Sequence, residues 1–340
     1  MLSEVADNSS LDDTLGRIEQ WRATLCELDY AKAYGIIADC VRDDPINTWH
    51  EVVRSHSGLF MKSVHSAGKT AEMADLLDCL HAIHPDIVHV PPRRGAEALR
   101  INKVQRQANL DKQLPSLVLV AQGKSGSAAF ANIVPQGFGL TLLTYSMITL
   151  AVIPSWAREF ARGGAAYTTH LWPHARNIDI LLAAGLNKAV VQTRDPRQIY
   201  LSFLHHQDRY RGDFPDKEKQ GYYDLAFADR ALLDLEYYDF IVKWLAGWVA
   251  AEDKGLTILF TTFEQFLDDA QVATRRIIDF YGADEKFFDA NAAFYKSDGV
   301  DYHFRRGEKE EWRRAFAPRL CKSLNDRLPP SWFEKFGWNP

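Results

Sequence analysis

A lysine-containing turn of small residues follows an apolar run in the middle of the chain. The turn reads Gln122-Gly123-Lys124-Ser125-Gly126-Ser127, it comes directly after LPSLVLVA, and an apolar helix is expected after it. Backbone N–H groups at the start of a helix and the helix dipole favour a bound phosphate, and Lys124 adds a full positive charge. Val118 stands where a Walker A loop needs its first glycine, so that motif is excluded. The turn therefore indicates a phosphate site of another kind; an ordinary Gly/Ser turn is the structural alternative.

A second candidate begins where another expected strand ends. The run Thr193-Arg194-Asp195-Pro196-Arg197 follows KAVVQ, and the helical segment after it carries Ser202. Proline suits the first turn of a helix, so Arg194 falls at the carboxyl end of the strand, where a guanidinium can hold a phosphate with two bonds. Ser202 can offer a hydroxyl to the same anion. A salt bridge between Asp195 and Arg197 at the start of the helix is the structural alternative.

A third candidate is basic and lies near the end of the chain. It reads Phe304-Arg305-Arg306-Gly307, and Trp312 follows six residues after the second arginine. Adjacent arginines before a glycine predict a flexible basic clamp for an anion. An ordinary charged surface loop is the alternative.

Composition limits the class of protein. The 340 residues are 46% hydrophobic and 25% charged, which excludes a mostly disordered chain. The net charge of −5 argues against a large basic face for duplex nucleic acid. The acidic N-terminus lacks the pattern of a signal peptide. No CxxC pair is present, so we expect reduced thiols in a cytoplasmic protein rather than a zinc site or a disulfide framework; the cysteines are Cys26, Cys40, Cys79 and Cys321.

One uncharged stretch requires a membrane test. No charged residue occurs from Ser125 to Trp156, but its clean apolar run, Leu140 to Ile153, is shorter than the roughly 20 residues that a span needs. We therefore expect a core helix over this run and no integral membrane segment.

Periodicity predicts two regions. Apolar residues at helical spacing predict an all-helical N-terminal domain over residues 1–110, and strands alternating with helices predict an α/β domain over 111–340. Such a domain has a parallel sheet with helices on both faces, and its ligand site lies at the carboxyl ends of the strands. The expected strands are LPSLVLVAQ, AAYTTHL, KAVVQTRDP and LTILFTTFE; the expected helices are NIDILLAAGLN, RQIYLSFLHHQDRY, ALLDLEYYDFIVKWLAGWVAAEDKG and QVATRRIIDFYG.

Over residues 114–318 these three segments together resemble the superfamily of sulfotransferases that use 3′-phosphoadenosine-5′-phosphosulfate (PAPS). The shared order is a strand with Lys-Ser-Gly-Ser, then Arg-Asp-Pro-Arg with a serine eight residues after its first arginine, then Arg-Arg-Gly before a tryptophan. Thr262-Phe263-Glu264 looks like the family's Tyr-Glu step. Ser127, Ala128 and Ala129 stand where the family often has Thr-Thr-Trp, which removes a hydroxyl and an aromatic ring from the nucleotide site.

The resemblance implies a P-loop-like sulfotransferase fold, PAPS as cofactor, adenosine 3′,5′-bisphosphate as its product, and no metal. Backbone N–H groups of Ser125, Gly126 and Ser127 would cradle the 5′-phosphate, and Lys124 would act in catalysis on the leaving phosphate. The 3′-phosphate would be bound by Arg194, Ser202, Arg305 and Gly307. The full set of implied nucleotide-binding residues is Lys124, Ser125, Gly126, Ser127, Ala128, Arg194, Ser202, Phe263, Arg305, Arg306 and Gly307.

The same resemblance implies a catalytic base. The family often supplies a histidine from a Lys-Thr-His-Leu segment at a strand end, and Thr168-Thr169-His170-Leu171 stands at that point, with Thr168 in place of the lysine. His170 is thus the candidate base, while a carboxylate remains the alternative.

Three functions stay open. The first is a sulfotransferase acting on an acceptor hydroxyl, small-molecule or glycan, with a carbohydrate or glycolipid preferred by analogy. The second is a nucleotide-dependent phosphotransferase, and the third is a catalytically inactive nucleotide-binding or interaction protein, which Ala128 and Ala129 favour. The N-terminal helices are candidates to bind a large acceptor or to close a homodimer; no nucleic-acid partner is expected.

Overall fold

A computed structural model of the chain describes residues 8–27, 29–45, 47–48, 52, 60, 63–83, 95–142, 151–214, 217–218, 220–294 and 307–340. The chain divides into two compact units. The first unit comprises Met1–Val118 and Gly139–Asn187, and the second comprises Leu119–Phe138 and Lys188–Pro340. The boundary expected at residue 110 stays a prediction.

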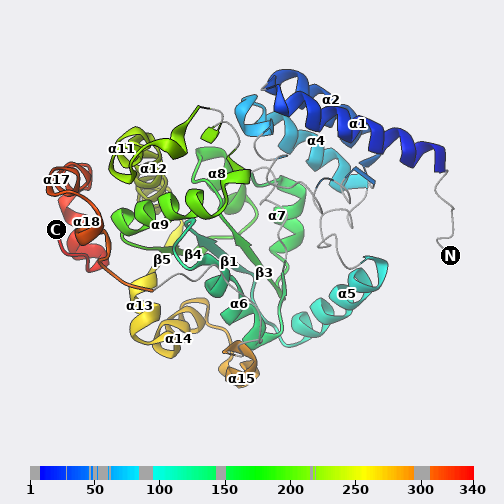
Figure 1. Ribbon diagram of the computed structural model, residues 1–340. Helices are drawn as coiled ribbons and strands as arrows, with labels where there is room; N and C mark the ends of the chain where they lie inside the picture. The colour runs from blue at the N-terminus through cyan, green and yellow to red at the C-terminus, as the bar shows by residue number, and fades with distance from the viewer. Residues whose placement is uncertain are drawn as a thin grey trace. The chain divides into compact units, whose positions relative to one another are not determined.

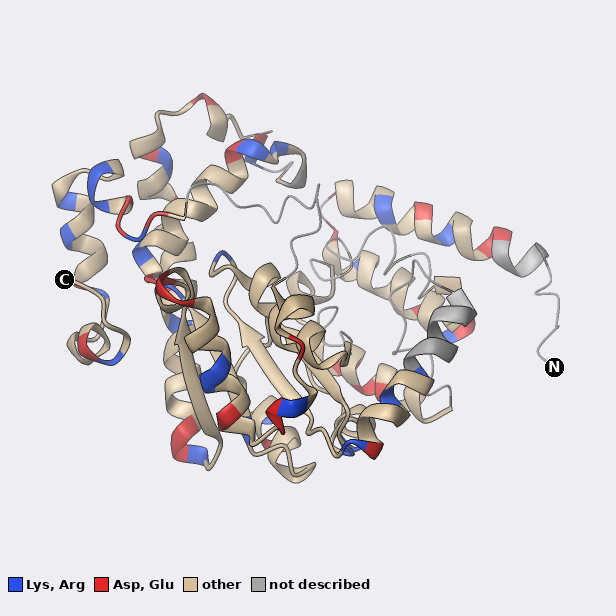
Figure 2. Cartoon of the chain, turned by 90° about the horizontal axis from the view of Figure 1, so that it is seen from below, with Lys and Arg blue, Asp and Glu red and all other residues tan. Residues whose placement is uncertain are grey.

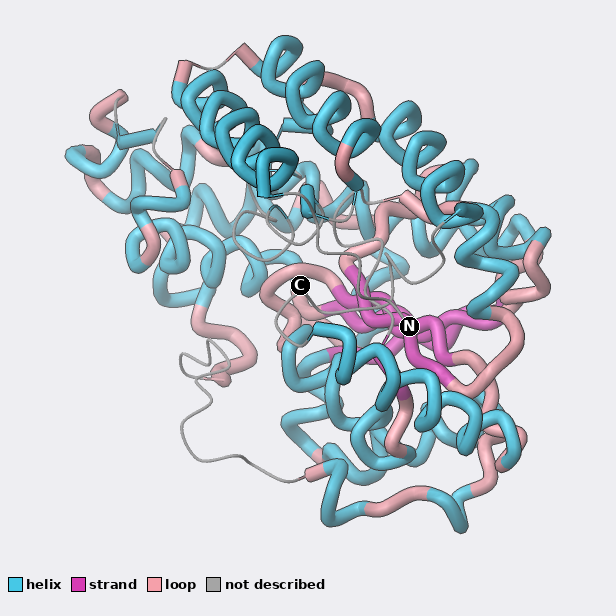
Figure 3. The backbone as a smooth tube through the Cα atoms, turned by 90° about the vertical axis from the view of Figure 1, so that its right-hand side faces the viewer, coloured by secondary structure: helices cyan, strands magenta, loops and turns pink. Residues whose placement is uncertain are grey.

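A single parallel sheet gives the protein its α/β class. Its five strands have the order β2-β3-β1-β4-β5, and Figures 1 and 3 show the strands with helices around them. The recorded pairs β2–β3, β1–β4 and β4–β5 are parallel. Parallel strands covered by helices are rich in apolar residues. The strands are β1 (Leu117–Ala121), β2 (Thr141–Leu142), β3 (Ala165–Thr169), β4 (Lys188–Thr193) and β5 (Thr257–Thr262).

The first two helices of the first unit pack against each other at the N-terminal end. α1 and α2 contact each other along their length, and Trp21 and Ile37 are fully buried, as the apolar spacing predicts. Later in this unit, Nη1 of Arg106 in α5 donates a hydrogen bond to Oε1 of Glu159 in α7 at 2.7 Å. The helices are α1 (Asn8–Cys26), α2 (Tyr30–Asp43), α4 (Thr70–Ile83), α5 (Gly95–Asp111), α7 (Pro154–Phe160) and α8 (Ala175–Ala183).

In the second unit, helices cover both faces of its strands. α9 contacts α12 on one face, and α6 contacts α14 on the other (Figure 1). Trp244 and Trp248 of α12 are buried, as their helical spacing predicts. The helices are α6 (Ser127–Phe138), α9 (Pro196–Arg209), α11 (Phe227–Leu233), α12 (Leu235–Ala251), α13 (Phe263–Asp268), α14 (Ala270–Tyr281), α15 (Ala290–Ala293), α16 (Trp312–Ala315), α17 (Pro318–Asn325) and α18 (Pro330–Phe336), with 3-10 turns η3 (Arg211–Asp213), η4 (Tyr222–Asp224), η5 (Glu252–Lys254) and η6 (Glu285–Phe287).

The core helix expected over Leu140–Ile153 is wrong where the structure describes it. Thr141 and Leu142 form β2, paired with Ala165 and Ala166 of β3, and residues 151–153 are not helical. Helix α7 begins only at Pro154, where a residue without an N–H costs the helix nothing. Residues 143–150 of this prediction lie outside the described part of the chain.

The long amphipathic helix expected from Ala231 onward is two helices. α11 ends at Leu233 and α12 begins at Leu235, with Asp234 between them at φ −92° and ψ 15°. The Asp234 carboxylate accepts hydrogen bonds from Lys217 and from the hydroxyl of Tyr222. These two donors hold Asp234 at the junction, an arrangement that helical periodicity alone does not reveal.

Charged residues of both signs are interspersed along the helices (Figure 2). Among the described helices, none combines the length and the apolar character that a bilayer crossing requires.

We expect Gly137→Ala to destabilise the second unit. A Cβ atom at Gly137 would lie 2.1 Å from Cε2 of Phe288, whose ring packs edge-on against Phe138. Overpacking of this kind costs about 1–3 kcal/mol. The matched control is Gly16→Ala in α1, where no atom lies within 4 Å and alanine should stabilise the helix by about 0.5–1 kcal/mol. Urea unfolding measures both; equal stability of Gly137→Ala and the wild type would contradict the expectation.

Candidate functional site

The turn between β1 and α6 is a tight turn stabilised by hydrogen bonds between its own residues. Lys124 and Gly126 both adopt left-handed backbone conformations, with φ of 66° and 76°. Positive φ is uncommon for a residue other than glycine. Ser125 is fully buried, its hydroxyl donates to the carbonyl of Gln122 at 2.6 Å, and its N–H donates to the same carbonyl at 3.2 Å. The two hydrogen bonds of Ser125 to Gln122 therefore stabilise the conformation of the turn.

Buried polar side chains from the neighbouring strands fix this turn. The amide of Gln192 in β4 donates to the carbonyl of Ser125 at 3.1 Å, and the hydroxyl of Thr193 donates to the side chain of Gln122 at 2.8 Å. Thr261 of β5 in turn donates to the side-chain oxygen of Gln192. Satisfied buried networks of this kind hold a unique geometry. The turn is thus held by both strands that follow β1 in the sheet order.

The start of α6 presents unused backbone donors. The N–H groups of Ala129 and Phe130 donate to the carbonyl of Gly126 at 3.1 Å each. Among the described residues, the N–H groups of Gly126, Ser127 and Ala128 have no recorded acceptor. The first N–H groups of a helix lack partners within it and can bind an anion. The available donors are therefore shifted by one residue relative to those expected, because the N–H of Ser125 closes the turn.

Lys124 is a partly buried cation. Burial lowers the pKa of its ammonium to about 8, because desolvation disfavours the charged form. A bound anion would compensate for the lost hydration.

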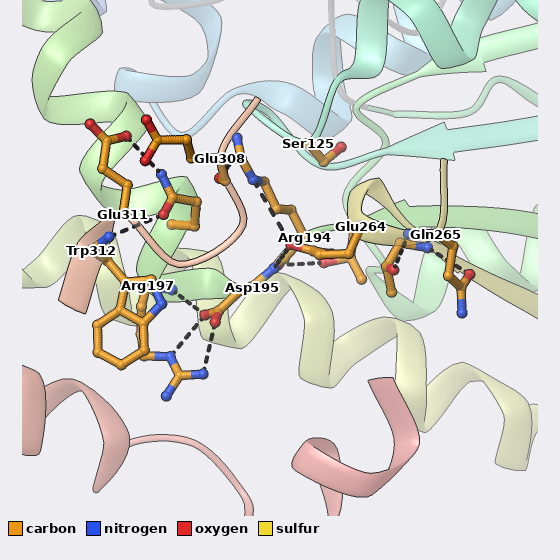
Figure 4. A network of polar contacts seen from close by, with 12 residues as sticks. Ser125, Arg194, Asp195, Arg197, Glu264, Gln265, Glu308, Glu311 and Trp312 are labelled. Carbon is orange, nitrogen blue, oxygen red and sulfur yellow. Dashed lines mark hydrogen bonds and ion pairs between the residues drawn. The ribbon is translucent and has the colours of Figure 1, made fainter. Parts of the chain in front are cut away.

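Arg194 lies at the end of β4, close to the lysine turn. Its Nη2 donates to the carbonyl of Glu308 at 2.7 Å (Figure 4). Its guanidinium carbon lies 4.3 Å from the centre of the Phe263 ring. The same ring approaches the turn, since a Cβ atom at Gly126 would lie 2.6 Å from Cδ2 of Phe263. Phe263 therefore contacts two of the three candidate segments.

The third segment is anchored beside the second. The N–H of Trp312 donates to Oε1 of Gln198 at 3.1 Å, and the Gln198 amide donates to Glu311 at 3.4 Å. Together with the bond from Arg194 to Glu308, these contacts bring the chain from Gly307 onward to the start of α9. Arg305 and Arg306 lie outside the described residues.

Arg197 has a structural role. It is fully buried, and it forms the salt bridge with Asp195 that was the structural alternative for this segment, with Nη2–Oδ2 at 2.7 Å and Nε–Oδ1 at 2.9 Å. Its Nη1 donates to Asn325 at 2.6 Å, and its guanidinium stacks on Trp312 at 4.1 Å. Arg194 takes no part in this salt bridge, so the two arginines of the motif have separate roles.

The remaining predicted residues lie on expected elements. Ser202 is half-buried in α9, and His170 is half-buried directly after β3. His170 belongs to the first unit, whereas the lysine turn, Arg194 and Phe263 belong to the second. The role of His170 as base stays a prediction.

The roles of several residues of this site were not predicted from the sequence. Gln122 and Gln192 are buried polar residues in otherwise apolar runs, a signal that could have drawn attention to the network around Ser125. Glu264 was noted only as part of a motif, and the carbonyl of Glu308 carries no signal in the sequence. Within the described part of the chain, no group of three or more His, Cys, Asp or Glu residues is arranged to hold a metal ion.

The protein has structural similarity to a solved structure, whereas comparisons of its sequence find no match. No model of a protein family matches the sequence, and no curated protein matches it. The crystal structure of mouse sulfotransferase SULT7A1 complexed with PAP aligns with a TM-score of 0.42 and 18% sequence identity, covering 67% of this chain and 89% of that chain. The α/β class with a parallel sheet and an N-terminal helical region, expected from the sequence, is confirmed by the structure itself.

Proposed function

We propose that the protein is a sulfotransferase that transfers a sulfuryl group from PAPS to an acceptor hydroxyl of a small molecule or glycan, with a carbohydrate or glycolipid preferred. The observation that supports this most directly is the convergence of Gly126 and Arg194 on Phe263. One aromatic ring thereby lies against two separate groups that can bind anions, the N–H donors at the start of α6 and the buried guanidinium of Arg194. A nucleotide with phosphates on both its 5′ and 3′ positions requires two such groups.

The residues present fit that nucleotide. The free N–H groups of Gly126, Ser127 and Ala128 would hold the 5′-phosphate. The 3′-phosphate would be held by Arg194, Ser202, Arg305 and Gly307. PAPS would supply the sulfuryl group. The protein's own contribution would be positioning and neutralisation of charge, as in phosphoryl transfer.

Two side chains would act on the reacting groups. Lys124 would stabilise the negative charge that grows on the leaving phosphate, because its partly buried ammonium lies in the turn that holds this phosphate. His170 would take the proton of the acceptor hydroxyl. A carboxylate is the alternative base if His170 proves dispensable.

Arg194→Ala tests the site for the 3′-phosphate. We expect adenosine 3′,5′-bisphosphate to bind more weakly by about 2–3 kcal/mol, because a charge-assisted bond to a buried phosphate is lost. Isothermal titration calorimetry measures the affinity, and thermal unfolding checks that the variant is folded. The control is Arg209→Ala, because Arg209 is an exposed arginine at the last position of α9. This variant should bind the bisphosphate as the wild type does. Unchanged affinity of Arg194→Ala would remove this residue from the site.

The affinity should also depend on pH through Lys124. The protonated ammonium binds the anion, and its pKa in the free protein is about 8. Affinity should therefore be highest below pH 8 and fall above it, by up to about tenfold per pH unit. Lys124→Arg stays charged over this range and should abolish the fall. The same fall in Lys124→Arg would show that another group titrates.

His170→Ala separates chemistry from binding. We expect nucleotide affinity to stay nearly unchanged and single-turnover sulfate transfer to slow by about 10²–10⁴-fold, the usual contribution of a positioned base. His174→Ala, an exposed neighbour at the start of α8, is the matched control. Wild-type turnover in His170→Ala would move the base to a carboxylate. Tight nucleotide binding by the wild type with no transfer to any hydroxyl tested would instead favour an inactive nucleotide-binding protein.

A further inference from the structure

Glu264 is a buried carboxylate beside Arg194 to which the proposed mechanism gives no task. It is the second residue of α13, and its side chain is 15% exposed. Its Oε1 accepts a hydrogen bond from the N–H of Asp195 at 3.3 Å and lies 4.0 Å from Nε of Arg194 (Figure 4). Among the residues that the structure describes, no hydrogen-bond partner is recorded for the buried Oε2.

The charged groups around Glu264 come from the end of β4 and the start of α9. Burial raises the pKa of Glu264, and this is the largest effect. Hydrogen bonds from the backbone N–H groups of Glu264 itself and of Asp195 lower the pKa, as does the positive charge of Arg194, whereas the negative charge of Asp195 raises it; the net shift is upward. The segment at Glu308 contacts Arg194 through its backbone carbonyl. Within the described part of the chain, Arg194 is the cation for which the structure records an ion pair with Glu264.

A phosphate on Arg194 would change the charge state that Glu264 prefers. The guanidinium would then be shared between two anions, and two negative groups at one site raise the pKa of the weaker acid. Protonation at Oε2 would break no recorded hydrogen bond, and Oε1 would still accept from the N–H of Asp195. The geometry therefore allows Glu264 to become neutral without rearrangement of its recorded contacts.

On the basis of the proposed function, we infer that Glu264 is a positioning residue. Before a phosphate binds, the ionised carboxylate of Glu264 holds Arg194. When the 3′-phosphate of the nucleotide binds, Glu264 takes up one proton from solvent. Arg194 makes the contact with phosphate, and Glu264 acts through it. The proton enters at Oε2 of Glu264, and no covalent bond to the nucleotide forms.

Glu264→Gln is the decisive variant. The glutamine has nearly the same shape, its side-chain oxygen can still accept from the N–H of Asp195, and it cannot titrate. Adenosine 3′,5′-bisphosphate is titrated into each protein by calorimetry, in buffers that differ in heat of ionisation, from mildly acidic pH to neutrality. The measured quantity is the number of protons taken up per nucleotide bound. Subtracting the variant from the wild type cancels the titrations of Lys124 and of the nucleotide's own phosphates.

We expect the wild type to take up more protons than Glu264→Gln, with a difference of up to one. Its affinity should also gain up to about tenfold per pH unit of acidification relative to the variant. Glu236→Gln, an exposed carboxylate on α12, removes the same charge elsewhere and should behave as the wild type does.

Equal proton uptake by the wild type and Glu264→Gln would overturn the inference, whatever the variant's affinity, and would leave the proposed function intact. A wild type that does not bind the bisphosphate would overturn both. If Glu264→Gln does not fold, infrared difference spectra of the wild type decide the matter. Binding should then produce the carbonyl band of a newly protonated carboxyl group, and its absence would overturn the inference.

Discussion

The close approach of the Gly126 backbone to the ring of Phe263 is the constraint on which the arrangement of the site depends. Any side chain at Gly126 would enter the space of that ring, and the left-handed backbone there disfavours one as well. Phe263 is in turn the ring on which Arg194 stacks. A residue at the start of α13 thus sets the spacing between a turn after β1 and a guanidinium after β4.

Buried polar groups perform two different tasks around this contact. The side chains of one buried network are satisfied by one another and by the backbone, so they hold the turn without exposing a charge; they are Gln122, Gln192, Thr193 and Thr261. Arg197 is a buried charge satisfied by Asp195 and by distant parts of the chain, which makes it a structural element. Lys124 and Glu264 are different, because burial lowers the pKa of Lys124 and raises the pKa of Glu264, and each shift favours the neutral form of the side chain. Groups shifted in this way are common where a ligand exchanges charge with a protein.

Much of the sheet could be predicted from the sequence because its physical signals are local. The runs that form β1, β3, β4 and β5 are apolar and bounded by turn residues, and Pro196 with Asp195 marks the start of α9. β2 was missed since a two-residue strand has no periodicity, and its pairing with β3 is visible only in three dimensions. The break at Asp234 was missed for a related reason, because its hydrogen-bond partners are 12 and 17 residues away in sequence.

The candidate site was predictable in part. Arg194 and the lysine turn follow from residue type and position after a strand, but these signals presented an anion site at Arg194 and a salt bridge of Asp195 with Arg197 as alternatives and did not separate the two. That separation depends on burial, since Arg197 is enclosed by partners from the last part of the chain. The one-residue shift of the free N–H groups depends on the hydrogen bond of Ser125 to Gln122, which needs the coordinates of the turn.

The partners of Arg197 have a consequence for the order in which the polypeptide is made. Its Nη2 donates to the carbonyl of Asn339, and its Nη1 donates to Asn325, so two of its hydrogen-bond acceptors are synthesised more than a hundred residues after it. Domains generally fold as units during synthesis. A nascent chain that has passed Asn325 but not yet extended to Asn339 would enclose a guanidinium that lacks one of these acceptors, and a shorter chain would lack both, which is costly. The second unit should therefore complete its folding only after translation has passed Asn339, while the helices at the N-terminal end carry no such requirement from Arg197.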